Sequence, residues 1–157
     1  MDTSVFAGIA VAVLHVTSPS FNENGNIPAK FSCQGDNISP ALSVRGVPPE
    51  ARSLAIVVED PDAPDGTVIH WAAWNMAPTD NINEKSLDGI QGKNSRGGNG
   101  YMGPCPPDGT HHYHFKVYAL DMMLQLEDGS SKEQLEAAMR GHIVGQGELI
   151  GLYAKSK

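Results

Sequence analysis

Two apolar runs and the turn between them decide the fold: Ser53-Leu-Ala-Ile-Val-Val58, then Glu59-Asp60-Pro61-Asp62-Ala63-Pro64-Asp65-Gly66, then Val68-Ile-His-Trp-Ala-Ala-Trp74. Short continuous runs of apolar and β-branched residues are typical of buried strands. Proline has no N–H to donate to a neighbouring strand, so the first strand must end near Asp60. The stretch therefore predicts two buried strands that are joined by a tight turn.

Further strands are predicted on both sides of this pair. Residues 19–50 are rich in Ser, Asn, Gly and Pro, a composition typical of short strands joined by irregular loops. Residues 111–120 and 142–153 are predicted as two more strands. Successive side chains of a strand point to opposite faces, so the first of these has two distinct faces. We expect His111, Tyr113, Phe115 and Val117 to face the core, and His112, His114, Lys116 and Tyr118 to face away from it.

One helix is predicted, over residues 131–140. It begins with a Ser-x-x-Gln capping box at Ser131 and ends before Gly141. Residues 78–110, by contrast, are expected to be mostly loop. Because loops of this length in compact domains usually carry a binding site or are disordered, this segment is a candidate for function.

The composition indicates a single domain over residues 1–157. The chain has 157 residues, of which 40% are apolar, and this is enough for one ordinary core. The net charge is −7 and the basic residues are scattered along the sequence. Binding to nucleic acid relies on clustered positive charge, so no nucleic-acid partner is expected.

An apolar stretch near the start of the chain, residues 5–14, invites comparison with a targeting or membrane segment. It is not preceded by a basic residue, as a signal peptide would be, and it is shorter than the roughly 20 residues of a membrane helix. We interpret it as an edge or core strand. The sequence thus predicts a soluble protein without integral membrane association. We expect it in the cytoplasm, or in the periplasm or outside the cell where an upstream signal has been removed, and we leave the oligomeric state, monomer or dimer, open.

The common catalytic and cofactor signatures are absent from the sequence. There is no G-x-S-x-G, H-E-x-x-H, Walker or C-x-x-C motif. A G-x-G-x-x-G match at residues 98–103 is followed by Pro104-Cys-Pro-Pro107, where no helix can begin, so it does not predict a dinucleotide site. His112 and His114 could chelate a metal ion together, but no third ligand is identifiable. We therefore expect no catalytic residue, no metal site and no cofactor.

Four motifs carry a family resemblance: Asp60-Pro-Asp-Ala-Pro64, His70-Trp71, Gly103-Pro-Cys-Pro-Pro107 and Gly109-Thr-His-His-Tyr113. In order and spacing they resemble the phosphatidylethanolamine-binding, or Raf kinase inhibitor-like, family. Gly35-Asp-Asn-Ile-Ser-Pro40 and Met139-Arg-Gly-His-Ile-Val144 resemble its prokaryotic branch, so the resemblance covers residues 14–153. Residues 1–13 would then form an extra strand or an extension.

The resemblance implies an all-β fold, an antiparallel β-sandwich with one or two peripheral helices. It also implies a regulatory or inhibitory module that binds phosphate, a phosphate monoester or a phospholipid headgroup in a small-anion pocket at one end of the sheets. Some family members inhibit kinases or proteases, so such an enzyme is a candidate partner. Cys33 and Cys105 would lie near one end of the domain, where they could form a disulfide. Carried over position by position, the pocket would be lined by Asp60, Asp62, His70, Gly103, Pro104, His111 and Tyr113.

The residue types in this set suit an anion. His70 and His111 can donate N–H bonds, Tyr113 can donate an O–H bond, and amides of the loop near Gly103 add further donors. An anion would be repelled by Asp60 if the carboxylate faced it. We expect Asp60 instead to accept a hydrogen bond from an imidazole N–H and to favour the charged form of that ring.

Two alternatives and two departures from the family pattern accompany this interpretation. The protein could inhibit a protease or kinase through its surface loops, or it could be a weak hydrolase in which Asp60 and His70 act together as general base for a water molecule. His112 stands where an Arg usually follows the pocket His, which puts the salt bridge of that Arg in doubt. Val44 lies near the position of a common Trp, which predicts altered packing there.

Overall fold

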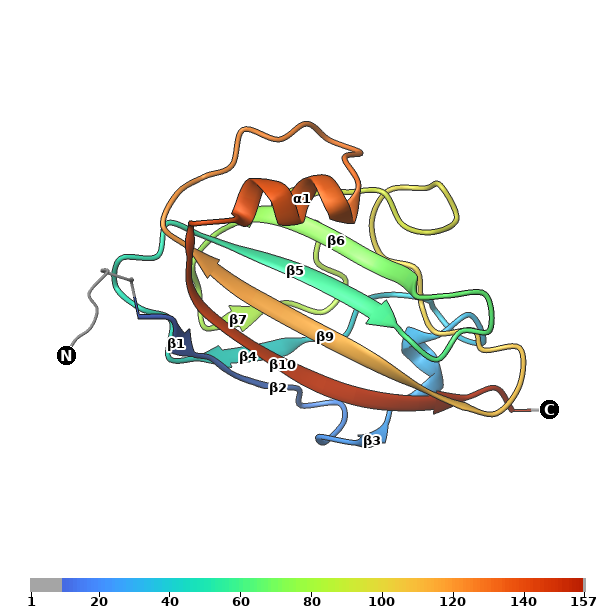
Figure 1. Ribbon diagram of the computed structural model, residues 1–157. Coiled ribbons are helices and arrows are strands. Elements are labelled where there is room, and N and C mark those ends of the chain that lie inside the picture. The colour runs from blue at the N-terminus through green and yellow to red at the C-terminus, as the bar shows by residue number, and fades with distance from the viewer. Residues whose placement is uncertain (1–9, 157) are drawn as a thin grey trace.

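The computed structural model describes residues 10–156, which form two β-sheets and one α-helix (Figure 1). The larger sheet has seven strands in the order β1-β10-β9-β5-β6-β8, with β3 also paired to β10, and the smaller sheet has the order β2-β4-β7. The elements are β1 (Ala12–Val13), β2 (His15–Thr17), β3 (Gly25–Asn26), the 3-10 helix η1 (Ala29–Phe31), β4 (Leu42–Arg45), β5 (Ser53–Asp60), β6 (Val68–Met76), β7 (Asn81–Ile82), β8 (Ile90–Gln91), β9 (Thr110–Leu120), α1 (Lys132–Met139) and β10 (Ile143–Ala154).

The central strands of the larger sheet are buried on both faces, which explains why β5 and β6 are continuously apolar in the sequence. On one face, Ile56 of β5 packs in a core that also holds Val44 of the smaller sheet. On the other face, Val57 packs with Leu135 of α1, and Figure 1 shows the helix lying against β5 and β6. The pairings β10–β9, β9–β5 and β5–β6 are all antiparallel. The predicted all-β fold with a peripheral helix is confirmed.

The helix forms where the sequence predicts it. The hydroxyl of Ser131 accepts from the N–H of Gln134, and the Gln134 side chain accepts from the N–H of Ser131, which completes the capping box. Gly141 has a φ of 84°, a left-handed conformation that glycine adopts without strain just after a helix. Among residues 10–156, no helix is long and apolar enough to cross a membrane.

Short strands are where the sequence-based expectations differ from the structure. Residues 78–110, expected to be mostly loop, contain β7 and β8. Each has two residues, too few to show a periodic pattern, and each forms because a longer neighbour offers hydrogen-bonding partners. Within the apolar stretch 5–14, residues 5–9 lie outside the described residues, and β1 forms a parallel edge strand on β10. The predicted core face of β9 is confirmed, because His111, Tyr113, Phe115 and Val117 are all buried.

Candidate functional site

Three strands of the larger sheet carry polar side chains to the same end of the molecule. Asp60 is the last residue of β5, His70 the third residue of β6 and His111 the second residue of β9. Because β5 runs antiparallel to both β6 and β9, its end lies beside their starts. All three side chains are buried, as is Tyr113 two residues further along β9. Together they line a cavity of about 250 Å³.

A loop over residues 101–107 closes the other side of the cavity. The N–H of Gly103 donates to Oδ1 of Asn37 at 2.8 Å, so this amide is not free to bind a ligand as the sequence suggested. Only glycine fits here, because a Cβ would collide with that same oxygen and with the backbone of Phe31. The cavity is completed by Ala63, Val68, Ser95, Arg96, Met102, Cys105, Pro106 and Pro107.

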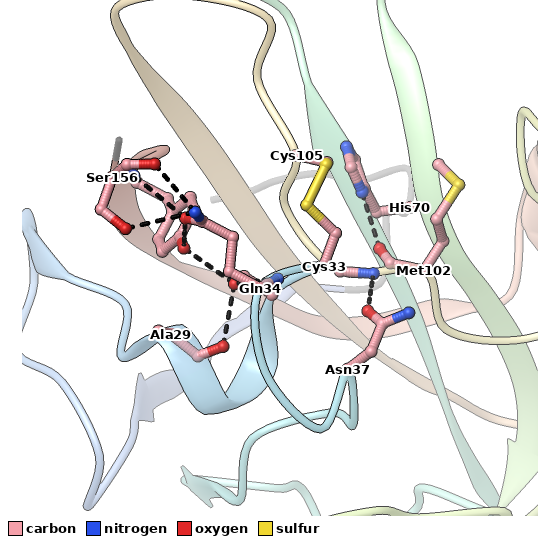
Figure 2. Close-up of a disulfide and its surroundings, with 11 residues drawn as sticks. Ala29, Cys33, Gln34, Asn37, His70, Met102, Cys105 and Ser156 are labelled. Carbon is pink, nitrogen blue, oxygen red and sulfur yellow. Dashed lines mark hydrogen bonds between the residues drawn. A yellow bond between two sulfur atoms is a disulfide. The ribbon is translucent and has the colours of Figure 1, made fainter.

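A disulfide fastens this loop to the segment that follows η1. Cys33 and Cys105 are 72 residues apart in the chain. Their Cα atoms lie 5.5 Å apart, and their sulfur atoms form a disulfide bond (Figure 2). The N–H of Cys33 also donates to the carbonyl of Pro104, and the hydroxyl of Tyr101 donates to the carbonyl of Phe31 at 2.7 Å. The wall of the cavity is therefore held in place by covalent and hydrogen bonds within the protein, which reduces the entropy lost when a ligand binds.

The imidazole of His70 is oriented by the same loop. Its Nδ1 lies 2.6 Å from the carbonyl oxygen of Met102 (Figure 2). A carbonyl can only accept, so Nδ1 carries the proton, and Nε2 of the neutral ring is left as an acceptor. Burial lowers the pKa of His70 below its usual value of 6.5. The ring is thus neutral at pH 7, and its Nε2 becomes a donor only when the ring gains a proton.

The second imidazole, that of His111, is oriented by Asp60. Nδ1 of His111 lies 2.7 Å from Oδ2 of Asp60, and both side chains are almost completely buried. Oδ1 of Asp60 accepts from the backbone N–H of Asp62 at 2.8 Å, so both carboxylate oxygens have partners. The expectation that Asp60 accepts from an imidazole is met by His111. The pairing of Asp60 with His70 in the hydrolase alternative is wrong, because the register places Val68 opposite Asp60 and the Nδ1–H of His70 donates to the carbonyl of Met102.

Tyr113 contributes a buried hydroxyl. Its side chain is 1% exposed, and the hydroxyl oxygen has no hydrogen-bond partner among the described residues. Burial, together with the nearby charges of Asp60 and Asp62, raises the pKa of Tyr113, so the group stays protonated and can donate. A buried hydroxyl without a partner costs about 1–3 kcal/mol. A ligand that accepts from it would recover this energy.

Two of the seven residues that the sequence assigned to the pocket do not line this cavity. The carboxylate of Asp62 turns to the opposite face of β9, where it accepts from the backbone N–H of His112 and lies 2.7 Å from its Nδ1. The carbonyl of Pro104 is bonded to Cys33. The lining set that the sequence anticipated is therefore reduced to Asp60, His70, Gly103, His111 and Tyr113.

The structure also shows the surroundings of the two residues that depart from the family pattern, His112 and Val44. His112, which stands where the family's Arg is usual, has its Nδ1 2.7 Å from Oδ2 of Asp62. Val44 is fully buried between the sheets. His114, the other histidine of the outer face, forms a hydrogen bond with Glu148. The described part of the chain has no group of three side chains that could hold a metal ion.

Comparisons with known proteins show the family and the fold of the chain. The family model described as phosphatidylethanolamine-binding protein matches residues 17–154. A UPF0098 protein of Pyrococcus horikoshii is 49% identical over 149 residues, which cover 88% of this chain and 75% of that protein. A crystal structure of a putative phosphatidylethanolamine-binding protein homologue from Chlamydia trachomatis has a TM-score of 0.87 at 46% identity, over 95% of this chain and all of that one. Escherichia coli YbcL has a TM-score of 0.82 at 28% identity, over 91% of this chain and 99% of that one.

Proposed function

The chain belongs to the phosphatidylethanolamine-binding protein family, and on that premise we propose that it binds a small phosphate-type anion in the cavity at the end of its larger sheet. The observation that carries the proposal is the hydroxyl of Tyr113, which is buried in the cavity and has no hydrogen-bond partner among residues 10–156. The size is in keeping with a small ligand, because about 250 Å³ is below the roughly 300–1,000 Å³ of sites for drug-sized molecules.

Protons take part in the binding that we propose. The Nδ1 atoms of His70 and His111 are committed to Met102 and Asp60, so Nε2 is the nitrogen that each ring has left for a ligand. In a neutral ring this atom accepts, and in a protonated ring it donates. A fully ionised anion such as sulfate therefore binds with uptake of a proton by an imidazole. Phosphate, with a second pKa near 6, can instead bring the proton itself.

We further propose that the protein is a regulatory or inhibitory binding module rather than an enzyme. A hydrolytic alternative is supported by one contact, the 2.7 Å pair between Asp60 and His111, which is the arrangement of an oriented general base. Screening for turnover of phosphate esters and peptides separates the two. Turnover that His111→Gln abolishes would favour the hydrolase.

The binding proposal is tested by thermal shift and calorimetry with phosphate and sulfate. An anion present at 100 times its dissociation constant should stabilise the folded protein by about 2.7 kcal/mol. Tyr113→Phe removes only the unpartnered hydroxyl, and we expect it to weaken binding about tenfold because a hydrogen bond to a charged group contributes about 1.5 kcal/mol.

The matched control is Tyr118→Phe, on the same strand but in the cluster beneath α1, and it should leave the affinity unchanged. Equal affinity of wild type and Tyr113→Phe, or no thermal shift with either anion, would contradict the proposal.

A further inference from the structure

The titratable side chains that line the cavity differ in the charge that they carry. Asp60 is paired with His111, and His70 is neutral at pH 7 because burial opposes its charge. Tyr113 is protonated and uncharged. Among the lining residues of the described chain, Arg96 is then the one fixed positive charge.

The position of Arg96 is fixed by the turn that carries it. The Asn94 side chain accepts from the N–H of Arg96 at 3.0 Å and donates to the carbonyl of Gly100. Ser95 bonds Ile69 of β6 in both directions, through its own N–H and through its hydroxyl. The turn is therefore attached to the strand that carries His70, and the backbone of Arg96 is held at the edge of the cavity.

The guanidinium of Arg96 has no partner in the described part of the chain. Within residues 10–156 it makes no hydrogen bond to another residue and no ion pair, although the chain as a whole carries a net charge of −7. Arg96 is exposed, whereas the two imidazoles and Tyr113 are buried. The cavity thus has a hydrogen-bonding interior, in which Asp60 is paired with His111, and a positive charge at its mouth.

We propose that Arg96 binds a second acidic group of the ligand, and that the preferred ligand is a small phosphate ester, free or in a lipid headgroup, with a carboxylate or second phosphate close to the ester oxygen. This proposal rests on the proposed function, since the phosphate occupies the interior. A ligand with an ammonium group in the same place would meet a like charge and bind less well. Arg96 is accordingly a specificity-determining residue, and its planar fork of donors suits a carboxylate or phosphate oxygen pair.

The test is a series of three phosphate monoesters of similar length whose tails differ in charge: phosphoglycolate, ethyl phosphate and phosphoethanolamine. We expect wild-type affinity by calorimetry to fall in that order, by about fivefold for each step, the size of one exposed charge interaction. Arg96→Gln should make the three affinities equal, and Arg96→Glu should reverse their order. The differences should also shrink at high salt, because exposed charges are screened.

Arg52→Gln is the matched control for the loss of one exposed arginine. Arg52 precedes β5, and the eight residue steps from Arg52 to Asp60 span about 26 Å of extended chain, so the substitution changes the net charge at the far end of the strand. The order of the three esters should persist in this variant. Wild-type protein that binds the three equally, or an order that survives in Arg96→Gln, would overturn the role of Arg96 while leaving anion binding intact. Failure of all three esters and of sulfate to bind would overturn the proposed function and this inference together.

A parallel measurement separates a free ester from a lipid headgroup. Phosphatidylcholine vesicles that contain phosphatidylserine or phosphatidylethanolamine are sedimented with wild type and with Arg96→Gln. Preferential sedimentation with phosphatidylserine that Arg96→Gln loses would identify a lipid source. Retained preference for phosphoglycolate without vesicle binding would identify a free ester, and preference for phosphatidylethanolamine vesicles would contradict the proposal.

Discussion

His111 and His112 are neighbours on β9, and each has its Nδ1 2.7 Å from a carboxylate, that of Asp60 at the end of β5 and that of Asp62 in the turn that follows. The side chains of the first pair, His111 and Asp60, are 8% and 4% exposed, and those of the second, His112 and Asp62, are 51% and 39% exposed. Alternation along β9 sends the two imidazoles to opposite faces, one into the cavity and the other into solvent. Two pairs of the same chemistry therefore lie in different surroundings.

Burial explains the difference. In the interior, the loss of one partner leaves a charged or polar group without solvent, which costs about 3–5 kcal/mol for a buried ion pair. At the surface, water replaces the lost partner, and an ion pair contributes about 0–1 kcal/mol. The buried pair orients the ring of His111 toward the proposed ligand, and the exposed pair holds the turn after β5 against β9.

The largest expected effect is on stability. His111→Ala leaves the carboxylate of Asp60 buried without its imidazole, and we expect a loss of about 3 kcal/mol in the free energy of unfolding. His112→Ala should cost about 1 kcal/mol or less, because Asp62 keeps the backbone N–H of residue 112 and is solvated. Urea denaturation of the two variants measures both values. Equal losses would mean that burial does not distinguish the pairs.

Anion binding should separate the pairs next. His111→Gln can still donate to Asp60 but has no ring nitrogen to protonate, so sulfate affinity should fall by about 2 kcal/mol, or about thirtyfold. His112→Gln and His114→Ala, on the outer face, should change the affinity little. Calorimetric titration with sulfate provides the measurement, and equal effects from all three variants would place the site elsewhere.

The third prediction concerns pH and the other imidazole of the cavity, that of His70. The pKa of His70 is lowered by burial, so between that pKa and the unfolded value of 6.5 the unfolded chain binds more protons than the folded protein. The stability of the free protein should therefore decrease as the pH falls below 6.5. Sulfate affinity should increase over the same range, because protonated His70 donates. Both trends should be reduced in His70→Gln, and pH-independent sulfate binding would mean that no imidazole takes up a proton.

The smallest expected effect belongs to the exposed pair. Hydrogen bonds from the His112 side chain and backbone lower the pKa of Asp62 below 3.8. This contribution to stability is present above 3.8 and is lost as the pH falls through the lowered pKa. Asp62→Asn should thus change stability by less than about 1 kcal/mol at neutral pH and should reduce the loss of stability in acid. Acid titrations followed by circular dichroism, with wild type alongside, check this, and a large loss at neutral pH would contradict it.

Local patterns in the sequence were enough to identify the elements that build the site. The apolar runs of β5 and β6, the alternation of β9 and the capping box of α1 each lie within a dozen residues, and each depends on the side chains of that segment alone. The proline after Asp60 marked the end of β5, and the polar residues at the starts of β6 and β9 marked the same end of the sheet. The residue motifs also identified the family, whose membership the comparisons show.

Contacts between segments were decided only by the tertiary structure. Asp60 pairs with His111 rather than His70 because strand register and the 101–107 loop determine the neighbours of each ring. Asp62 faces away from the cavity because of the conformation of one turn, which the sequence does not specify. Arg96 is 26 residues from His70 and has no pattern that marks it, yet the bonds between Ser95 and Ile69 bring its turn to the cavity. Side-chain patterns report which face of an element is buried, whereas a binding site depends on distances between elements, and these are fixed only when the sheets, loops and disulfide are assembled.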